Sequence, residues 1–295
     1  MREDYNPQHA TSYSRKPSSI FKLSNLTNIP IILLIIIIFA LGYISSSISY
    51  RTKCPSDHNR YDIPQCGTPV PPEQVRSILV DGLYDGVSPY KDFPSPGIAS
   101  LLQPTRLEGW GSNEAVFSNL IHKVKPRTII EIGTFLGSSA THMANLTRHL
   151  GLDTQILCLD DFRGWAGFRG MFKGFPMQNA NVMLLAQFMK NVITLNFSES
   201  ILPLPFSSAS SLDKLCELGI RGDLIEVDAA HDFHSAWDDI NRAYRLLSPN
   251  GILFGHDYFN GQDDYGVRRA VDLFAKIHGF GIKTTKEHWI LDVYG

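Results

Sequence analysis

The sequence of 295 residues lacks several features that mark common classes of protein. It has no basic excess, because 27 Lys and Arg are set against 29 Asp and Glu, and this argues against nucleic acid as a partner. Four cysteines without a CxxC pair are too few for a small disulfide scaffold and indicate no zinc site of that type. Apolar residues are not scarce: they make up 43% of the chain, which excludes a disordered protein and allows a sizeable core.

One long stretch also lacks charge. No Asp, Glu, Lys or Arg occurs between Lys22 and Arg51, and residues 29–49 are mostly large and apolar. About 20 helical residues span a hydrocarbon core, so we expect a transmembrane signal anchor over residues 29–49 and a cytosolic tail over residues 1–28. A cleaved signal peptide and a buried soluble helix are the alternatives, but the polar leader is longer than a usual n-region. The prediction is a single-pass type II membrane protein of the Golgi or endoplasmic reticulum, with a lumenal catalytic domain.

Residues 50–104 are rich in proline and are expected to form a stem that leads into the main domain. Cys54 and Cys66 lie in this stem, where an oxidising lumen could pair them. Cys158 and Cys216 fall within apolar patterns, so we expect both to be buried thiols.

From residue 105 onward, short apolar runs alternate with helical periodicities. The predicted strands cover residues 128–132, 155–159, 192–195, 223–227, 251–255, 282–285 and 289–294, and the predicted helices cover 112–124, 138–150, 182–190, 211–218, 235–247 and 267–278. This alternation predicts an α/β domain over residues 105–295, with a mostly parallel, doubly wound sheet. Ligands of such sheets bind at the carboxyl ends of the strands.

The first two predicted strands end in residues suited to a nucleoside ligand. Gly133 lets the backbone bend sharply, and Gly137 lets the next helix begin close by with free N–H groups. The spacing is GxxxG rather than GxGxxG, which disfavours NAD or FAD. Asp160 follows 23 residues after Gly137, where a carboxylate can accept both hydroxyls of a ribose. A ligand-free turn, with Asp160 as a helix cap or a solvated side chain, is the alternative.

Acidic and imidazole side chains follow the fourth and fifth predicted strands. Asp228 and His231 follow the fourth strand, and His256 and Asp257 follow the fifth. Asp228 and Asp257 are candidate ligands of a divalent cation, and both histidines are candidate general bases, since imidazole titrates near neutral pH. A metal-free polar cluster is the alternative. The loop over residues 162–172, rich in aromatic, Gly and Arg residues, is a candidate lid or pocket wall, or simply an ordered surface loop.

Together these segments resemble class I S-adenosylmethionine-dependent methyltransferases. The resemblance lies in residues 131–137 (EIGTFLG), Asp160, residues 227–233 (VDAAHDF) and residues 249–258 (PNGILFGHDY). The last two segments, followed by residues 266–272, look most like the macrocin O-methyltransferase group. The resemblance implies a Rossmann-like sheet ordered 3-2-1-4-5-7-6, with the last strand antiparallel. It implies that S-adenosyl-L-methionine is held by Glu131, Gly133, Thr134, Phe135, Gly137, Ser139 and Asp160.

In related methyltransferases, acidic residues after strands four and five bind Mg²⁺, and Asp228 and Asp257 match those places. A third ligand is usually an Asp or Asn beside the second, whereas here the neighbours are His256 and Tyr258. The resemblance therefore makes Mg²⁺ or another divalent cation a candidate cofactor. His231, His256 and Asp228 are the candidate catalytic residues.

The resulting hypothesis is a membrane-anchored methyltransferase that methylates a hydroxyl of a sugar or another small molecule. The alternative is a non-catalytic, membrane-tethered protein that binds the cofactor or acts as a scaffold. A nicotinamide oxidoreductase is disfavoured by the missing GxGxxG pattern. The predicted partners are a small-molecule or glycan acceptor and the membrane, without nucleic acid; the pattern specifies neither the acceptor nor an oligomeric state.

Overall fold

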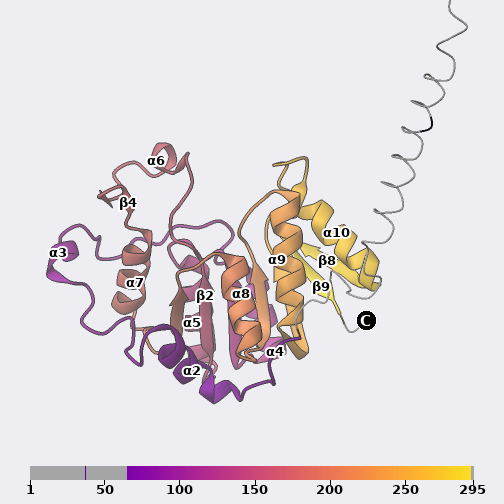
Figure 1. Ribbon diagram of the computed structural model, residues 1–295, viewed down its shortest axis with the longest axis horizontal. Helices are drawn as coiled ribbons and strands as arrows, with labels where there is room; N and C mark the ends of the chain where they lie inside the picture. The colour runs from indigo at the N-terminus through magenta and orange to yellow at the C-terminus, as the bar shows by residue number, and fades with distance from the viewer. Residues whose placement is uncertain (1–36, 38–64, 294–295) are drawn as a thin grey trace, which may run out of the picture. The chain divides into compact units, whose positions relative to one another are not determined.

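The computed structural model describes Ile37 and residues 65–293, and residues 65–293 lie in one compact unit (Figure 1). Apart from Ile37, the predicted tail and anchor lie outside the described residues. In the part of the chain that the structure describes, none of the helices is both long and apolar enough to cross a membrane. The longest of these helices have 13 residues, which rise about 20 Å against a hydrocarbon core of about 30 Å. This finding contradicts the predicted localisation as a type II endomembrane protein.

A seven-stranded sheet forms the centre of the fold, in the order β5-β2-β1-β6-β7-β9-β8. Its strands are β1 (Thr128–Ile132), β2 (Gln155–Leu159), β5 (Ile201–Leu204), β6 (Gly222–Val227), β7 (Leu247–Gly255), β8 (Gly281–Thr285) and β9 (His288–Asp292). β9 runs antiparallel to both of its neighbours, β7 and β8, and the other strand pairs of this sheet are parallel. Counted along this sheet, the order is 3-2-1-4-5-7-6, so the expected topology is confirmed.

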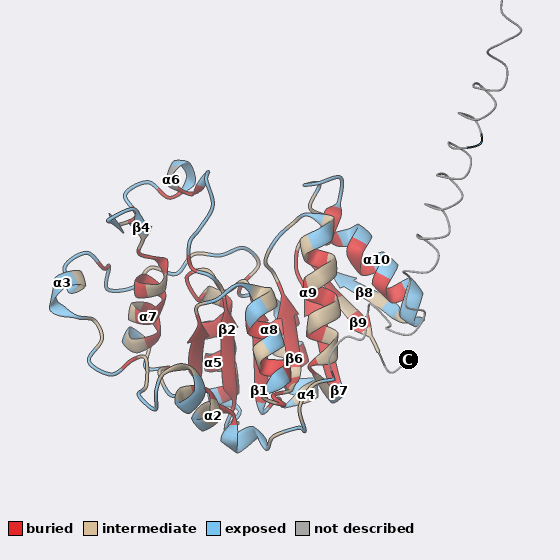
Figure 2. Cartoon of the chain, viewed as in Figure 1, coloured by how far each residue is buried: buried red, intermediate tan, exposed pale blue. Residues whose placement is uncertain are grey.

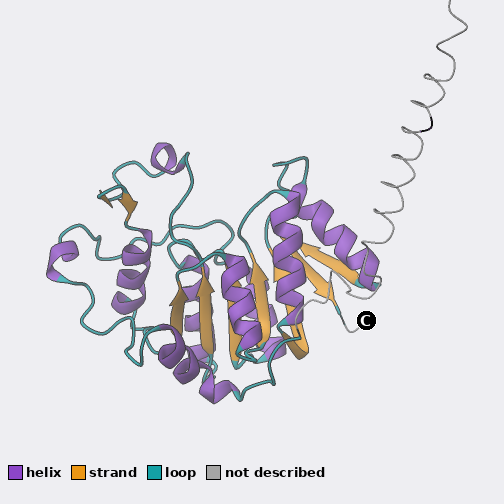
Figure 3. Cartoon of the chain, viewed as in Figure 1, coloured by secondary structure: helices purple, strands orange, loops and turns teal. Residues whose placement is uncertain are grey.

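Helices cover both faces of the sheet (Figure 3). One face packs against α4 (Ala115–Val124), α5 (Ser138–His149) and α7 (Leu184–Thr194). The other packs against α2 (Val75–Leu83), α8 (Ser208–Glu217), α9 (Phe233–Arg245) and α10 (Gly266–His278). The short elements are η1 (Pro72–Gln74), α3 (Pro96–Ala99), α6 (Phe168–Met171), β3 (Met177–Gln178) and β4 (Asn181–Val182).

Burial on both faces explains the sequence of the central strands. Every residue of β1 and β2 is buried (Figure 2). Successive side chains of a strand point to opposite faces, and accordingly Ile129 joins one apolar cluster while Ile130 and Ile132 join the other. A strand that is covered on both faces is apolar along its whole length rather than alternating.

The predicted third strand over residues 192–195 is wrong. Val192 and Thr194 belong to α7, and the third strand of the main sheet is β5. The β-branched residues of this run favour a strand locally, but Val192 is buried on the inner face of the helix. Pro203 lies within β5, which is compatible with a strand here because β5 is at the edge of the sheet.

The expected cysteine pairing is also wrong. Cys66 forms a disulfide with Cys216 at the end of α8, and Cys54 lies outside the described residues. Cys158 is a free, buried thiol, as predicted. The disulfide and the hydrogen bond from Gly67 N to Cys216 O (2.7 Å) hold residues 65–67 against the end of α8. Cys216 could not be assigned from its apolar surroundings, because its partner is 150 residues away.

Candidate functional site

The segment that follows β1, residues 133–137, makes a tight turn against the end of β6; we call it the glycine turn. Gly133 has φ +89°, and a Cβ at this position would collide with the carbonyl oxygen of Asp228. Gly137 has φ +82° and precedes α5, and a Cβ there would lie 2.8 Å from the ring of Phe188. Both positions therefore require glycine, because other residues rarely adopt this conformation and have no room here.

A buried carboxylate supports the glycine turn. Glu131 is fully buried and accepts hydrogen bonds from the hydroxyls of Thr134 and Ser139, and its Oε2 is 3.4 Å from Cys158 Sγ. Burial raises the pKa of Glu131, while the two hydroxyls partly oppose the shift. Because these side chains bind one another, they fix the shape of the turn and the start of α5.

Asp160 connects the glycine turn to the end of β2. Its carboxylate accepts hydrogen bonds from the backbone N–H groups of Phe135 (2.9 Å) and Phe162 (2.7 Å). Phe135 has φ +48°, so the first bond holds the turn in an uncommon conformation. Burial raises the pKa of Asp160, against the lowering effect of these bonds. An ionised carboxylate has about four acceptor positions, so about two remain for ligand hydroxyls.

The residues that follow β6 and β7 meet in one group, which we call the acid–imidazole cluster (Asp228, His231, His256 and Asp257). His256 Nδ1 is 3.4 Å from Asp257 Oδ2 and 3.8 Å from Asp228 Oδ1. His231 Nε2 is 2.9 Å from Asp257 Oδ2. Asp257 has φ +62° and is bound by the side-chain amide of Asn260 (2.9 Å), which fixes its carboxylate at this place. The structure thus brings together all four residues that the sequence singled out.

Burial and mutual charge set the protonation of this cluster. Burial raises the pKa of Asp228 to about 7, although His256 lowers it. The hydrogen bond to Asp257 is the main cause that raises the pKa of His231 to about 9. Burial alone would raise the pKa of Asp257, but His231 and His256 outweigh it and hold that pKa well below its ordinary value. His231 is therefore charged at neutral pH in this arrangement, and this weakens the expectation that it acts as a base.

The cluster has the donors that a divalent cation prefers. One ligand atom each from Asp228, His256 and Asp257 lies within 4.8 Å of the others. His256 Nδ1 is buried without a hydrogen-bond partner, and both carboxylates lie within 4 Å of it. Two carboxylates and one imidazole suit a hard or borderline cation, so these residues fit the predicted metal.

Sequence reasoning missed the residues behind His256. The ring of His288, at the start of β9, lies 4.6 Å from the ring of His256, and its Nδ1 is 3.4 Å from Glu114 Oε2. Burial, followed by the neighbouring His256, lowers the pKa of His288 to about 4. Gly111 approaches both rings: a Cβ there would lie 2.6 Å from His256 Nε2 and 3.1 Å from His288 Cε1. The Gly-Trp-Gly sequence at residues 109–111 was the one local signal of such an approach.

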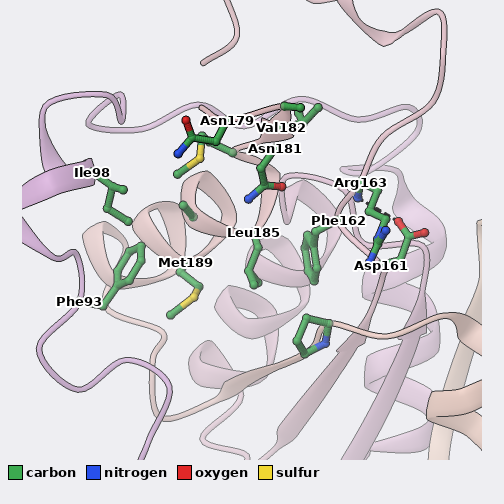
Figure 4. A pocket seen from close by; sticks show the side chains of 14 residues that line it. Phe93, Ile98, Asp161, Phe162, Arg163, Asn179, Asn181, Val182, Leu185 and Met189 are labelled. Carbon is green, nitrogen blue, oxygen red and sulfur yellow. Dashed lines mark hydrogen bonds between the residues drawn. The ribbon is translucent and has the colours of Figure 1, made fainter. Parts of the chain in front are cut away.

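A cavity of about 620 Å³ adjoins the end of β2 (Figure 4). Asp161 and Arg163 lie at one end of it and Phe93 and Ile98 at the other, with Leu185 of α7 between them. Its lining combines apolar side chains with the polar side chains of Asp161, Arg163, Asn179 and Asn181. Because Asp161 directly follows Asp160, the cavity begins beside the proposed ribose position.

Comparison with known families gives the class of the domain. Residues 130–258, which include the glycine turn and the acid–imidazole cluster, match the family model described as a methyltransferase domain. Over these residues, which are fewer than half of the chain, the sequence is similar to methyltransferase domains. The prediction of an S-adenosylmethionine-dependent methyltransferase is confirmed at this level, while the macrocin-like subgroup stays a prediction.

Individual relatives of this methyltransferase domain are distant. The uncharacterized protein y4gI of Sinorhizobium fredii is 24% identical over 152 residues, which cover 50% of this chain and only 15% of that protein. The O-methyltransferase from Bacillus cereus in complex with SAH is 17% identical, with a TM-score of 0.46, over 72% of this chain and 93% of that chain. The O-methyltransferase TomG from Streptomyces achromogenes, in complex with SAM, is 15% identical, with a TM-score of 0.47, over 64% of this chain and 82% of that chain.

Proposed function

We propose that this methyltransferase transfers the methyl group of S-adenosyl-L-methionine to a hydroxyl group of a small molecule. The observation that carries the proposal is the contact between the glycine turn and the acid–imidazole cluster, at Gly133 and Asp228. A cofactor over the turn would present its methyl group to an acceptor held at the cluster. The likeness of residues 227–233 and 249–258 to the macrocin O-methyltransferase group supports a sugar hydroxyl as the acceptor.

The cofactor site would use backbone and carboxylate groups. The backbone of the glycine turn and the start of α5 would receive the methionine part, because both glycines leave the main chain accessible. Asp160 would bind the two ribose hydroxyls with its remaining acceptor positions. Glu131, Thr134 and Ser139 would hold the turn, and Phe135 would lie beside the cofactor. S-adenosylmethionine supplies an activated methyl group, so the protein chiefly aligns the acceptor and removes its proton.

The acid–imidazole cluster would bind the acceptor hydroxyl. Asp228, His256 and Asp257 would hold Mg²⁺ or another divalent cation, whose charge would lower the pKa of the hydroxyl. In the metal-free case, His256 or Asp228, whose Nδ1 and Oδ1 lie 3.8 Å apart, is the proposed group that takes the proton. His231 would orient Asp257 through its 2.9 Å contact.

The test is methyl transfer by the full chain from labelled S-adenosylmethionine to a panel of sugars and phenols. EDTA should abolish the transfer, and Mg²⁺ or Mn²⁺ should restore it. Asp257→Asn should lose activity but keep its affinity for S-adenosylhomocysteine. Asp264→Asn is the matched control, because Asp264 is an exposed carboxylate that shares the positive φ of Asp257.

Full activity in EDTA would contradict the proposed role of the metal but not the proposed methyl transfer. In that case His256→Ala should lower the rate by about 10²–10⁴-fold, as for the loss of a general base. Tight binding of S-adenosylhomocysteine without transfer to any acceptor would instead support the non-catalytic alternative.

A further inference from the structure

Six aromatic side chains gather around the glycine turn. The ring of Phe135 lies 6.0 Å from Trp110, 6.0 Å from Trp165 and 5.1 Å from Phe172. Phe168 of α6 lies 5.0 Å from Phe172, and Phe175 lies 5.2 Å from Phe168. The loop that the sequence marked as a lid or pocket wall is therefore packed on the turn through its aromatic residues.

Members of this group differ sharply in exposure. Phe168 and Phe172 are 2% and 9% exposed, whereas Trp110 and Trp165 are 55% and 45% exposed. Aromatic contacts hold the two tryptophans in place from behind, while their remaining surface faces solvent. Grouped apolar surface of this kind typically marks a binding site, because it gains free energy only when something covers it.

The position of Trp110 ties this surface to the reaction centre. Gly109 approaches the start of α5, where a Cβ would lie 3.3 Å from Ser138 Cβ. Gly111 approaches the acid–imidazole cluster, where a Cβ would lie 2.6 Å from His256 Nε2. Trp110 therefore lies between the proposed cofactor site and the proposed hydroxyl site.

We infer that Trp110, Phe135 and Trp165 form an aromatic platform that binds the ring of the methyl acceptor. This inference rests on the proposed function and adds the class of substrate to it. An indole face binds a flat apolar surface, and the nearby carboxylates bind hydroxyl groups. The acceptor is a hydroxylated ring with one apolar face, either a pyranoside with its C–H face or a phenol with its π face.

Fluorine NMR of the full chain labelled with 5-fluorotryptophan tests the platform. The four tryptophans give four signals, assigned with single Trp→Phe variants. With S-adenosylhomocysteine present, methyl β-glucopyranoside and catechol are titrated separately. Saturable shifts of the Trp110 and Trp165 signals with either compound support the platform and identify the ring class. Trp237 of α9, which stacks on Phe233 and packs against Phe274, serves as the internal control whose signal should not move.

Steady-state kinetics provide a second test, with an acceptor of the ring class that binds in the NMR titration. Trp110→Ala and Trp165→Ala should raise KM for that acceptor by about 5- to 150-fold, the range expected for loss of one stacking face. KM for S-adenosylmethionine should change less than about twofold in both variants, and Trp110→Phe should restore most of the acceptor affinity. Ile277→Ala, which removes an exposed apolar side chain of α10, should leave both KM values unchanged.

Two failures are distinguishable. If calorimetry detects no binding of S-adenosylhomocysteine, the proposed function is wrong. If S-adenosylhomocysteine binds but neither compound moves the Trp110 and Trp165 signals up to its solubility limit, the platform is wrong and the proposed function stands. Equal KM values for wild type, Trp110→Ala and Trp165→Ala would also overturn the platform.

Discussion

The carboxylate of Asp160, the residue proposed to bind the ribose, accepts hydrogen bonds from the backbone N–H groups of Phe135 and Phe162. Replacing Asp160 by Ala should weaken S-adenosylhomocysteine binding by about 10- to 100-fold, because hydrogen bonds to a charged group contribute about 1.5–3 kcal/mol. Calorimetry on the full chain measures this change, and the melting temperature shows whether the turn still folds.

The neighbouring carboxylate provides the control for this prediction. Asp161 is exposed, and its side chain accepts a hydrogen bond from the backbone N–H of Arg163 (2.9 Å). Asp161→Ala should change the affinity by less than about threefold. Unchanged affinity in Asp160→Ala would mean that the ribose binds elsewhere.

At the residue scale, the sequence revealed the side chains that end a strand but not those that arrive from other parts of the chain. Asp160, Asp228 and Asp257 could be predicted because parallel strands bring their carboxyl ends to one edge of a sheet. Trp110 and His288 reach the same place from a loop and from the start of β9. Their positions depend on long-range packing, which local periodicity does not encode.

At the scale of single elements, α9 carries a carboxylate whose burial should make stability depend on pH. Asp239 is 4% exposed, and burial raises its pKa to about 6, with Ser208 lowering it only in part. The folded-state pKa exceeds the model-peptide value of 3.8, so between these values the folded state binds more protons than the unfolded state. The unfolding free energy should therefore fall by about 2–3 kcal/mol as pH rises from about 4 to about 6.

Asp239→Asn should remove this pH dependence. At pH 7 the variant should be more stable than wild type by about 2–3 kcal/mol, and near pH 4 the two should be similar. Urea unfolding at several pH values measures the difference. Asp153→Asn, at an exposed position, should reproduce the wild-type profile; a wild-type profile in Asp239→Asn would show that Asp239 is ionised without cost in the folded protein.

The same scale shows where element prediction works. The predicted bounds of β1 and β2 agree with the structure because both strands are short, β-rich runs closed by turn residues. The end of α7 was predicted as a strand because Val192 and Thr194 favour a strand locally. Strand β5 was not predicted, because Pro203 disfavours a strand. Tertiary packing of α7 and the edge position of β5 decide both cases.

At the scale of the whole molecule, the order of the strands was predicted from the family resemblance and not from periodicity. Periodicity predicts which segments are strands, but parallel strands joined by helices can be ordered in several ways. The order β5-β2-β1-β6-β7-β9-β8 matters because it places β1 beside β6, and thereby Gly133 against Asp228.

Residues 65–71, which precede η1, bind the end of α8 and the residues that follow it. Besides the disulfide between Cys66 and Cys216, Val70 N donates to Gly219 O (3.0 Å). Gly219 has φ +71°, and a Cβ there would collide with the carbonyl oxygen of Thr68. The two backbone segments thus pack too closely for side chains between them.

Removing the disulfide should destabilise the domain without changing its site. In Cys66→Ser, the unfolding free energy should fall by about 2–4 kcal/mol, the usual contribution of a disulfide that closes a long loop. The affinity for S-adenosylhomocysteine should stay within about twofold, because the bond lies at the end of α8 and not among the residues proposed to bind the cofactor.

Dithiothreitol should lower the melting temperature of wild type to that of the Cys66→Ser, Cys216→Ser double variant. It should leave the melting temperature of the double variant unchanged, because that variant lacks both cysteines of the disulfide, and Cys158 is free and buried. An equal melting temperature for wild type with and without dithiothreitol, once thiol counting has shown full reduction, would mean that the backbone contacts alone hold this segment.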